Sequence, residues 1–353
     1  MAVMHVQSSE RKYPILIEAG ARLKTGSLLS SLTEKEYSSC MVITDEHAGK
    51  LYLDEVKQSF ETEVFVKTIA AGEQSKSVAV YEELLEYAAA SGLDRESAII
   101  ALGGGVVGDL AGFTAATYMR GIDFIQVPTT LLAHDSSVGG KTGINLGAGK
   151  NLAGAFHAPS AVIFDPETFS TLPRREWRSG LAEVIKHGLI RDPALLSFSL
   201  SSGSFKITED PDALCSLLEQ SIRVKKDIVE QDEKETGIRA FLNFGHTLGH
   251  AIEAEAGYGE WTHGEAVAAG MVFALELSEH VFEKDLGSKD IEASLRSLGY
   301  ETRMYKNMDR RSLIERMNRD KKSSRGQIRF VLLEHPGKPV LRQVSDSLLL
   351  KLL

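Results

Sequence analysis

The fold of this chain is decided by residues 97–112, SAIIALGGGVVGDLAG. Residues 97–102 form a short apolar run that ends in glycines, as expected of a parallel strand buried on both faces. The glycines let the backbone turn tightly into a helical pattern, and a helix N-terminus supplies free N–H groups for an anion. This order predicts one unit of an α/β sheet with a turn that can hold a phosphate.

The turn contains a G-x-G-x-x-G pattern at Gly103, Gly105 and Gly108. In dinucleotide-binding folds an acidic residue about twenty positions later meets the ribose from the end of the next strand. Here that residue is Asp123, which begins a predicted strand instead of ending it. The pattern therefore favours a phosphate-binding turn over a standard Rossmann fingerprint, and a simple strand–helix packing turn is the alternative.

Around this stretch, short β-rich runs alternate with helical patterns in the first half of the chain. Strands are expected at residues 13–18, 39–44, 64–69, 124–127 and 161–164, and helices at 76–90 and 108–119. Residues 127–156 are rich in glycine and small side chains and are expected to form a long functional loop.

Helical periodicity dominates the second half. It covers residues 175–190, 212–231, 240–256, 264–281, 288–298 and 310–319, and one β-like run follows at 327–333. We therefore predict two domains. Residues 1–172 form a Rossmann-like α/β domain with a mostly parallel sheet, and residues 173–353 form a mainly α-helical domain.

Composition limits the classes of function. The chain has 353 residues, 43% of them hydrophobic and 25% charged, and a net charge of −9. This composition indicates a soluble globular protein, and the negative charge argues against binding to nucleic acid. No apolar run reaches the length of a membrane span and no signal-peptide pattern is present, so no membrane partner is expected. Cys40 and Cys215 are the two cysteines, which fits a reducing cytoplasm.

A histidine-rich stretch, residues 243–265, reads NFGHTLGHAIEAEAGYGEWTHGE. His246 and His250 are four residues apart and share one helical face with Glu253. His263 follows a glycine-rich turn that can bring the next helix back alongside the first.

A second segment, GLAEVIKHGLI at residues 180–190, places Glu183, Lys186 and His187 on one helical face. Two imidazoles and one carboxylate from separate helices predict a three-ligand zinc site with an open position, as catalytic zinc requires. The alternative is that these are ordinary surface or buried histidines.

Polar residues on the glycine-rich segments are candidates for anion binding. The long segment presents Thr129, Thr130, Asp135, Lys141, Lys150 and Asn151, and GEQSK at 72–76 forms another polar loop. Lysines on such loops suit phosphate, although solvated surface lysines are the alternative. Lys225 and Arg239 could pair with a carboxylate or phosphate, or could belong to a solvated charged face.

Together these motifs resemble the 3-dehydroquinate synthase family of sugar-phosphate cyclases. The resemblance is carried by GGGVVGDLAGF, VPTTLLAHDSSVGGKTGIN, GKNLAGAF, GLAEVIKHG, DEKETGIRAFLNFGHTLGHAIE and HGEAVAAGM, in that order, and extends to DKKSSRGQIRFVLL. It implies a homodimer that uses NAD and zinc, with cobalt as a possible substitute. The implied reaction converts 3-deoxy-D-arabino-heptulosonate 7-phosphate, a phosphorylated keto acid, to 3-dehydroquinate and phosphate.

The resemblance also implies roles for individual residues. Glu183, His246 and His263 would bind the metal, and His250 would face the substrate instead. NAD would lie on Asp45, Glu73, Lys76, Gly104, Gly105, Val106, Val107, Gly108, Asp109, Thr129, Thr130, Lys141, Lys150, Thr168, Phe169, Ser170 and Thr171. Substrate would be held by Arg120, Asp135, Lys141, Lys150, Asn151, Lys186, Lys225, Arg239, Asn243, His250 and Lys321, with Lys322 as the alternative to Lys321. Arg120 would come from the partner subunit.

Three other functions remain open at this point. One is another sugar-phosphate cyclase, such as 2-deoxy-scyllo-inosose synthase, whose substrate has no carboxylate. Another is a metal-dependent polyol dehydrogenase, which would release NADH stoichiometrically. The third is a non-catalytic metabolite-binding protein. Lys225 and Arg239 favour the keto-acid substrate.

Overall fold

The computed structural model describes residues 2–202, 205–257, 259–320 and 328–353. By their internal contacts they form two compact units, Met1–Leu172 with Thr208–Ile222, and Pro173–Ile207 with Arg223–Leu353. Thr208–Ile222 contains the first half of helix α8 (Pro211–Gln231), which the sequence prediction placed wholly in the second domain. Helical periodicity continues through α8 without a break, so it carries no signal of this division.

The first unit is built on a seven-stranded sheet in the order β1-β2-β9-β6-β5-β3-β4. The strands are β1 (Ala2–Gln7), β2 (Lys12–Ile17), β3 (Cys40–Asp45), β4 (Phe65–Ile69), β5 (Ala98–Gly103), β6 (Asp123–Pro128) and β9 (Ala161–Phe164). Only the β1–β2 pair of this sheet is antiparallel. The chain passes outward from β3 to β4 and then returns to β5 on the other side of β3. In open parallel sheets, ligands bind at the carboxyl ends of the strands where the order reverses in this way.

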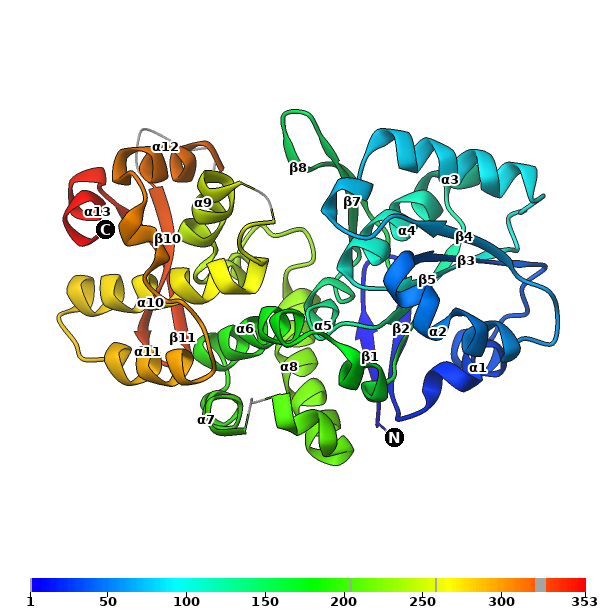
Figure 1. Ribbon diagram of the computed structural model, residues 1–353, viewed down its shortest axis with the longest axis horizontal. Coiled ribbons are helices and arrows are strands. Elements are labelled where there is room, and N and C mark those ends of the chain that lie inside the picture. Colours follow the sequence, from blue (N-terminus) through cyan, green and yellow to red (C-terminus); the bar gives the residue numbers. More distant parts are fainter. Residues whose placement is uncertain (1, 203–204, 258, 321–327) are drawn as a thin grey trace. The chain divides into compact units, whose positions relative to one another are not determined.

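Helices cover both faces of this sheet (Figure 1). Val42 of β3 packs with Tyr52 and Val56 of α2 (Glu46–Gln58), and α1 (Thr25–Thr33) covers the same face. Ile43, the next residue of β3, packs on the opposite face with α3 (Val78–Ala90) and with Leu110 of α4 (Gly105–Thr117). Burial on both faces explains the continuous apolar runs, and the predicted α/β fold is confirmed.

The prediction of a long loop over residues 127–156 is wrong. The segment contains α5 (Ala133–Ser136) and an antiparallel hairpin of β7 (Lys141–Leu146) and β8 (Gly149–Phe156). Glycines and polar residues occupy much of both strands, so no apolar alternation marks them. Backbone pairing defines the hairpin instead.

The second unit is mainly helical, as predicted. Its helices besides α8 are α6 (Arg174–Ile190), α7 (Pro193–Ser202), α9 (His246–Ala256), α10 (His263–Phe282), α11 (Ser288–Ser297), α12 (Arg310–Asp320) and α13 (Asp346–Leu352). The described part of the unit also contains an antiparallel hairpin of β10 (Ile328–His335) and β11 (Lys338–Val344). Helix α9 begins later than the predicted residue 240, because a 3-10 turn, η6 (Ile238–Asn243), and Gly245 in the left-handed region precede it.

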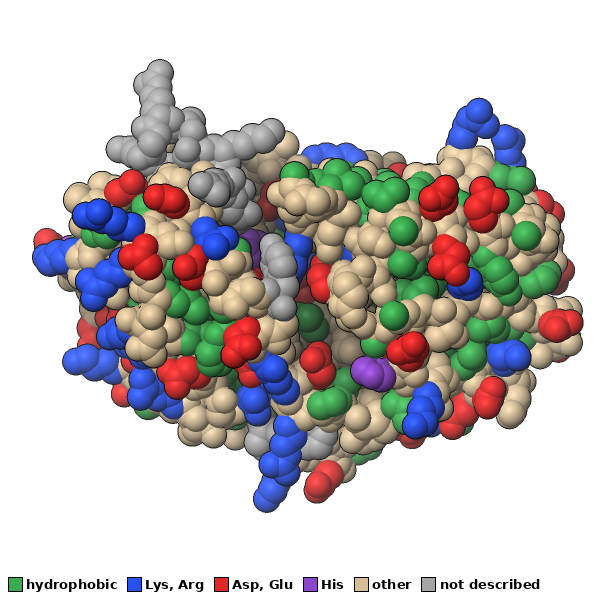
Figure 2. Space-filling model, turned by 45° about the horizontal axis from the view of Figure 1, so that its top comes forward, with side chains coloured by type: hydrophobic (Ala, Val, Ile, Leu, Met, Phe, Trp, Pro, Cys, Tyr) green, Lys and Arg blue, Asp and Glu red, His purple; other side chains and the backbone are tan. Residues whose placement is uncertain are grey.

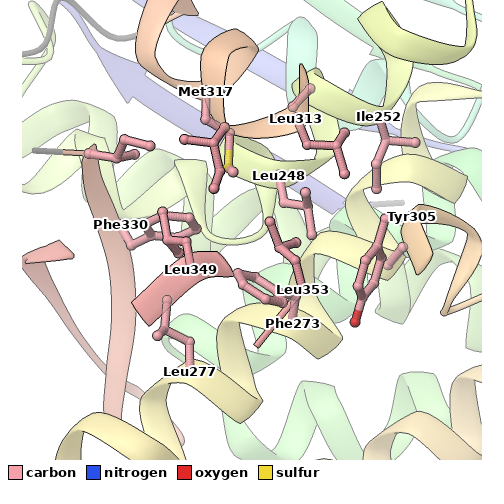
Figure 3. Close-up of a cluster of buried hydrophobic side chains, with 14 of the residues drawn as sticks. Leu248, Ile252, Phe273, Leu277, Tyr305, Leu313, Met317, Phe330, Leu349 and Leu353 are labelled. Carbon is pink, nitrogen blue, oxygen red and sulfur yellow. The ribbon is translucent and has the colours of Figure 1, made fainter. Parts of the chain in front are cut away.

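An apolar core of the second unit lies between α9, α10, α12, α13 and β10. Leu248 and Ile252 of α9 pack with Phe273 of α10 and Leu313 of α12 (Figure 3). At 100° per residue, the opposite side of α9 carries His246, His250 and Glu253. The core therefore orients α9 so that its polar face is available for a site.

The surface carries charges of both signs. Lys, Arg, Asp and Glu side chains are interspersed over the described part of the face in Figure 2. Among the helices that the structure describes, none combines the length and the apolar character needed to cross a bilayer.

Candidate active site

Three predicted metal ligands converge in the second unit. Oε1 of Glu183 lies 3.4 Å from Nε2 of His246 and 3.3 Å from Nε2 of His263. The residues come from α6, α9 and α10, and their ligand atoms all lie within 4.8 Å of one another. Residues separated by up to 80 positions in the sequence thus form one compact cluster.

Close helix packing produces this convergence. A Cβ atom on Gly264 of α10 would lie 2.1 Å from the carbonyl oxygen of Ser179 on α6. A Cβ atom on Gly270 would lie 1.9 Å from the carbonyl oxygen of Gly245, the residue before α9. Any side chain at either glycine would push the helices apart. The glycines therefore set the separation of the helices that carry Glu183, His246 and His263.

Both imidazoles of this cluster are oriented by their second ring nitrogen. Nδ1 of His246 is 3.1 Å from the carbonyl oxygen of Phe244, and Nδ1 of His263 is 3.1 Å from Oε2 of Glu253. A proton on Nδ1 of each ring, held by its acceptor, would leave the Nε2 lone pair on the side of Glu183. This is the tautomer that a metal needs.

A capping box fixes His263 at the first position of α10. The Thr262 side chain accepts a hydrogen bond from the backbone N–H of Glu265, and Glu265 accepts one from the backbone N–H of Thr262. Arg175 of α6 donates from Nε to Oε2 of Glu265 over 3.0 Å. The T-x-x-E spacing was visible in the sequence as THGE, but sequence reasoning missed its role beside a ligand.

These residues fit a tetrahedral divalent metal such as zinc. Oε1 of Glu183 is buried and has no hydrogen-bond partner among the described residues. Ligand atoms about 2.0–2.1 Å from a tetrahedral ion lie about 3.3–3.4 Å apart, the same as the two separations given above. A metal would thus satisfy an otherwise unpaired buried carboxylate oxygen.

The electrostatics also favour a cation. Burial alone would raise the pKa of Glu183, but Lys186 and His246 hold it well below its usual range. Burial opposes a charge on His263, yet the adjacent carboxylates of Glu183 and Glu253 raise its pKa to about 10. The two carboxylates therefore favour a positive charge at this cluster, which either a proton or a metal ion would supply.

His250 lies beside the ligand rings without belonging to the Glu183 group. Its ring centroid is 5.3 Å from that of His246 and 5.9 Å from that of His263. It forms a second possible ligand group with Glu253 and His263. The HxxxH spacing alone left both groupings open.

Other predicted substrate residues of the second unit are largely buried. Lys186, 1% exposed, is paired with Oε2 of Glu183. Lys225 and Arg239 are also buried, so the solvated-face alternative for these two is wrong. Asn243 donates to Oε1 of Glu235 over 2.8 Å, and Lys321 lies outside the described residues.

In the first unit, Lys76 is the centre of a polar cluster. Its Nζ, on a side chain 4% exposed, donates to Oδ2 of Asp109 and to Oδ1 of Asn151, both over 2.6 Å. Asn145 donates to Oε1 of Glu73 over 2.8 Å and from its backbone to the carbonyl oxygen of Lys76. Sequence reasoning did not single out Asn145.

A hollow of about 460 Å³ adjoins this cluster. Its lining includes Glu73, Lys76, Ser77, Asn145 and Gly147. Polar groups from GEQSK and from the end of β7 therefore face one concave surface. Such a surface can accept part of a nucleotide, although the role of each residue stays a prediction.

The other residues predicted to bind NAD lie where the parallel strands end. Asp45 ends β3 and caps α2, Gly104 caps α4 after β5, and Thr129 follows β6. The start of α4 contains Val106, Val107, Gly108 and Asp109, and Thr130 follows Thr129. The 3-10 helix η4 (Pro166–Thr171), after β9, contains Thr168, Phe169, Ser170 and Thr171. They gather at the edge where the strand order reverses between β3 and β5, the expected place for a nucleotide.

Asp123 lies at the opposite edge of the sheet, as its position in the sequence indicated. It begins β6 and pairs in register with Ala98, the first residue of β5. Arg11 contacts its Oδ1 at 2.5 Å and Lys35 contacts its Oδ2 at 2.7 Å. Asp123 therefore has a structural role away from the glycine turn.

The remaining predicted substrate residues also lie in the first unit. Asp135 is on α5, Lys141 begins β7, and Lys150 is on β8. Arg120 follows α4 and has a φ of 69°, directly after Met119 with a φ of 50°. Two successive non-glycine residues in the left-handed region are energetically costly, which is typical of functional segments.

Comparison with known proteins identifies the family. The 3-dehydroquinate synthase N-terminal model matches residues 66–179, and the C-terminal model of that family matches residues 180–323. The 3-dehydroquinate synthase of Halalkalibacterium halodurans is 51% identical, with 100% of this chain and 98% of the relative covered. That of Shouchella clausii is 48% identical, with 99% and 97% covered.

A solved structure has the same fold. It is a 2-deoxy-scyllo-inosose synthase complexed with carbaglucose-6-phosphate, NAD+ and Co2+, with 27% identity and a TM-score of 0.88. The likeness covers 99% of this chain and 98% of that one. Both family models and full-length relatives agree, and this chain therefore belongs to the 3-dehydroquinate synthase family.

Proposed function

We propose that this protein is a 3-dehydroquinate synthase that converts 3-deoxy-D-arabino-heptulosonate 7-phosphate to 3-dehydroquinate and phosphate. The observation that carries the proposal is the convergence of Glu183, His246 and His263 next to the buried Lys186. Relatives at 51% and 48% identity that bear this name support the substrate and product.

The proposed cofactors are NAD and zinc, with cobalt as a substitute. The 2-deoxy-scyllo-inosose synthase structure, with NAD+ and Co2+, supports this pair. When bound, the metal supplies a Lewis acid for a substrate hydroxyl and NAD supplies a reversible hydride acceptor.

Residues of the chain prepare the metal centre. Lys186 occupies Oε2 of Glu183 and so directs Oε1 toward the two imidazoles. His250, whose ring lies next to those of His246 and His263, would contact a substrate group held at the metal. Removal of a proton from the substrate hydroxyl would be favoured by the adjacent positive charges of Lys186 and the metal.

Other residues determine how the substrate is held. Lys225 and Arg239 would bind the carboxylate, since a guanidinium can donate two parallel hydrogen bonds to it. Lys141, Asn151, His250 and Lys321 remain the proposed contacts of the phosphate, and Arg120 would reach it from the partner subunit. Holding the ring-opened chain in one conformation would make the final carbon–carbon bond formation effectively unimolecular.

Two further proposals concern assembly and location. We propose a homodimer in which Arg120 serves the partner's site, as the family resemblance implies; the left-handed backbone of Met119 and Arg120 marks this segment as strained. Light scattering tests the dimer, and restored turnover on mixing Arg120→Ala chains with Lys186→Ala chains tests the exchange. Cys40 and Cys215, both described, are free thiols, which supports a cytoplasmic location.

Turnover tests the main proposal. Purified zinc-loaded protein is incubated with NAD and the heptulosonate phosphate, while released phosphate and NADH absorbance are followed together. A hexose 6-phosphate, which lacks a carboxylate, is the matched substrate control. Arg239→Ala tests carboxylate binding. We expect kcat/KM for the keto acid to fall, and the fall to correspond to a loss of about 1.5–3 kcal/mol of transition-state stabilisation.

The outcomes separate the alternatives. Phosphate release, no accumulation of NADH and a dehydroquinate product would support the proposal. Turnover of the hexose phosphate alone would indicate another sugar-phosphate cyclase. Stoichiometric NADH without phosphate release would indicate a dehydrogenase, and binding of these compounds without reaction would indicate a metabolite-binding protein.

A further inference from the structure

The two histidine ligands differ in what holds their second nitrogen. His246 contacts a backbone carbonyl through Nδ1, whereas His263 contacts the carboxylate of Glu253 at 3.1 Å. Glu253 is 8% exposed and lies on α9, on the same face as His246. The function proposed above gives this buried carboxylate no role.

We propose that Glu253 is a positioning residue of the metal centre. Its Oε2 accepts the hydrogen bond from Nδ1 of His263, which keeps the proton on Nδ1 and directs the Nε2 lone pair toward the metal. The inference rests on the metal site of the proposed function. It adds a residue that does not touch the metal but sets how tightly the metal is held.

The hydrogen bond from Glu253 restrains the His263 ring from a second helix. His263 is the first residue of α10, so its own helix constrains only one side of it. Glu253 reaches it from α9, and this hydrogen bond ties together the helices that carry His246 and His263. A ligand that can rotate about its side-chain bonds binds more weakly, because its freedom is lost on binding.

The charge of Glu253 acts in the same direction. A carboxylate acceptor on Nδ1 increases the electron density of the imidazole and makes Nε2 a stronger ligand. Loss of such a contact typically weakens metal binding about 10–100-fold. The effect should therefore be graded: an amide keeps an acceptor oxygen but loses the charge, and alanine loses both.

One competing reading comes from the same residues. Glu253, His250 and His263 also lie close enough together to hold an ion of their own. If that ion were bound in addition to the first, Glu253 would be a direct ligand, His263 would bridge the two ions through its two ring nitrogens, and the protein would bind two metal ions per chain. Metal stoichiometry separates the two readings, because the positioning role requires one ion.

The test compares Glu253→Gln and Glu253→Ala with the wild type in the absence of substrate and NAD. The matched control is Glu255→Gln, two residues later on α9, whose carboxylate contacts Arg316 at 2.5 Å and Ser312 at 2.6 Å. Zinc affinity is measured by competition with a chromophoric chelator, and zinc content is measured per chain. The visible absorption of the cobalt-loaded proteins reports the ligand field directly.

We expect one zinc per chain in every variant. Affinity should fall about 10-fold in Glu253→Gln and up to about 100-fold in Glu253→Ala, and stay unchanged in Glu255→Gln. The cobalt spectrum should shift only for the Glu253 variants. If Glu253→Ala does not fold, the isosteric Glu253→Gln carries the comparison.

Several results would overturn the inference. Wild-type zinc affinity in Glu253→Gln would do so even if the variant were less stable, because the role would then be structural. Two zinc ions in the wild type and one in Glu253→Gln would make Glu253 a ligand. A wild type that binds no zinc would remove the metal site itself, which distinguishes failure of the proposed function from failure of this inference alone.

Discussion

Replacing Gly270 with alanine tests whether helix packing sets the metal geometry. The new Cβ would lie 1.9 Å from the carbonyl oxygen of Gly245, whereas carbon–oxygen contacts need about 3.3 Å. The backbone around the start of α9 must therefore move about 1.4 Å away from α10. Metal–ligand distances tolerate only about 0.2 Å of error, so His246 can no longer bind together with His263.

We expect Gly270→Ala to lower the free energy of unfolding by about 1–3 kcal/mol, the usual cost of overpacking. Zinc affinity should fall by at least the ~10–100-fold seen when a supporting contact is lost. Stability is measured by urea unfolding with a chelator present, so that metal binding does not contribute to it. Zinc affinity is measured separately by chelator competition.

Gly49→Ala is the matched control. Gly49 lies inside helix α2, and the nearest atom to its added Cβ is the Thr44 methyl at 3.0 Å, which belongs to a side chain. The same chemical change should there leave zinc affinity unaltered and should not lower stability by more than a few tenths of a kcal/mol. Unchanged zinc affinity in Gly270→Ala would refute the reasoning that links this glycine to the ligand spacing.

Three more predictions follow from other contacts. Burial opposes the charge of Asp123, but Lys35 and Arg11 lower its pKa to about 2. Asp123→Asn should therefore lower the free energy of unfolding at pH 7. The expected loss is about 1–2 kcal/mol, because Lys35 is exposed to solvent and water weakens its interaction with Asp123. Because the folded pKa lies below the unfolded value of about 3.9, the difference from wild type should narrow as pH falls from about 4 to about 2 in urea titrations, and a constant difference would contradict this cause. Thr262→Ala should lower the free energy of unfolding by about 1 kcal/mol, because the capping box with Glu265 is lost. Urea unfolding with a chelator present measures this loss, and Thr262→Ser should restore the stability. Removing zinc with a chelator should lower the free energy of unfolding by about 2.7 kcal/mol compared with protein in zinc at 100 times its Kd. Thermal unfolding measures this difference, and a melting temperature that does not depend on zinc would contradict the metal site.

Local sequence patterns were sufficient for β2, β3, β4, β5, β6 and β9 and for helices α3 and α4 of the first unit, but they gave no prediction for β1, α1 and α2. The run at residues 97–112 predicted β5, the glycine turn and α4, because strand and helix periodicities differ over short distances. The position of Asp123 at the start of a strand also indicated that it could not face the turn. These conclusions depend only on neighbours in the sequence.

The hairpin β7–β8 could not be predicted in the same way. Its strands contain glycines and polar residues, and their pairing depends on backbone hydrogen bonds between segments. The break between the units inside α8 was equally hidden, since the helix is continuous. In both cases the local pattern carries no information about which element packs against the segment.

The sequence predicted one part of the metal centre, and the tertiary structure supplied the rest. By itself, the sequence determined the helices that carry Glu183, His246, His250 and His263, and the family resemblance chose three of them as ligands. Only the tertiary structure decided that Oε1 of Glu183 meets both Nε2 atoms and that Glu253 holds Nδ1 of His263. The physical reason is that helical spacing fixes which side chains share a face, whereas distances between helices depend on close backbone contacts that no single segment encodes.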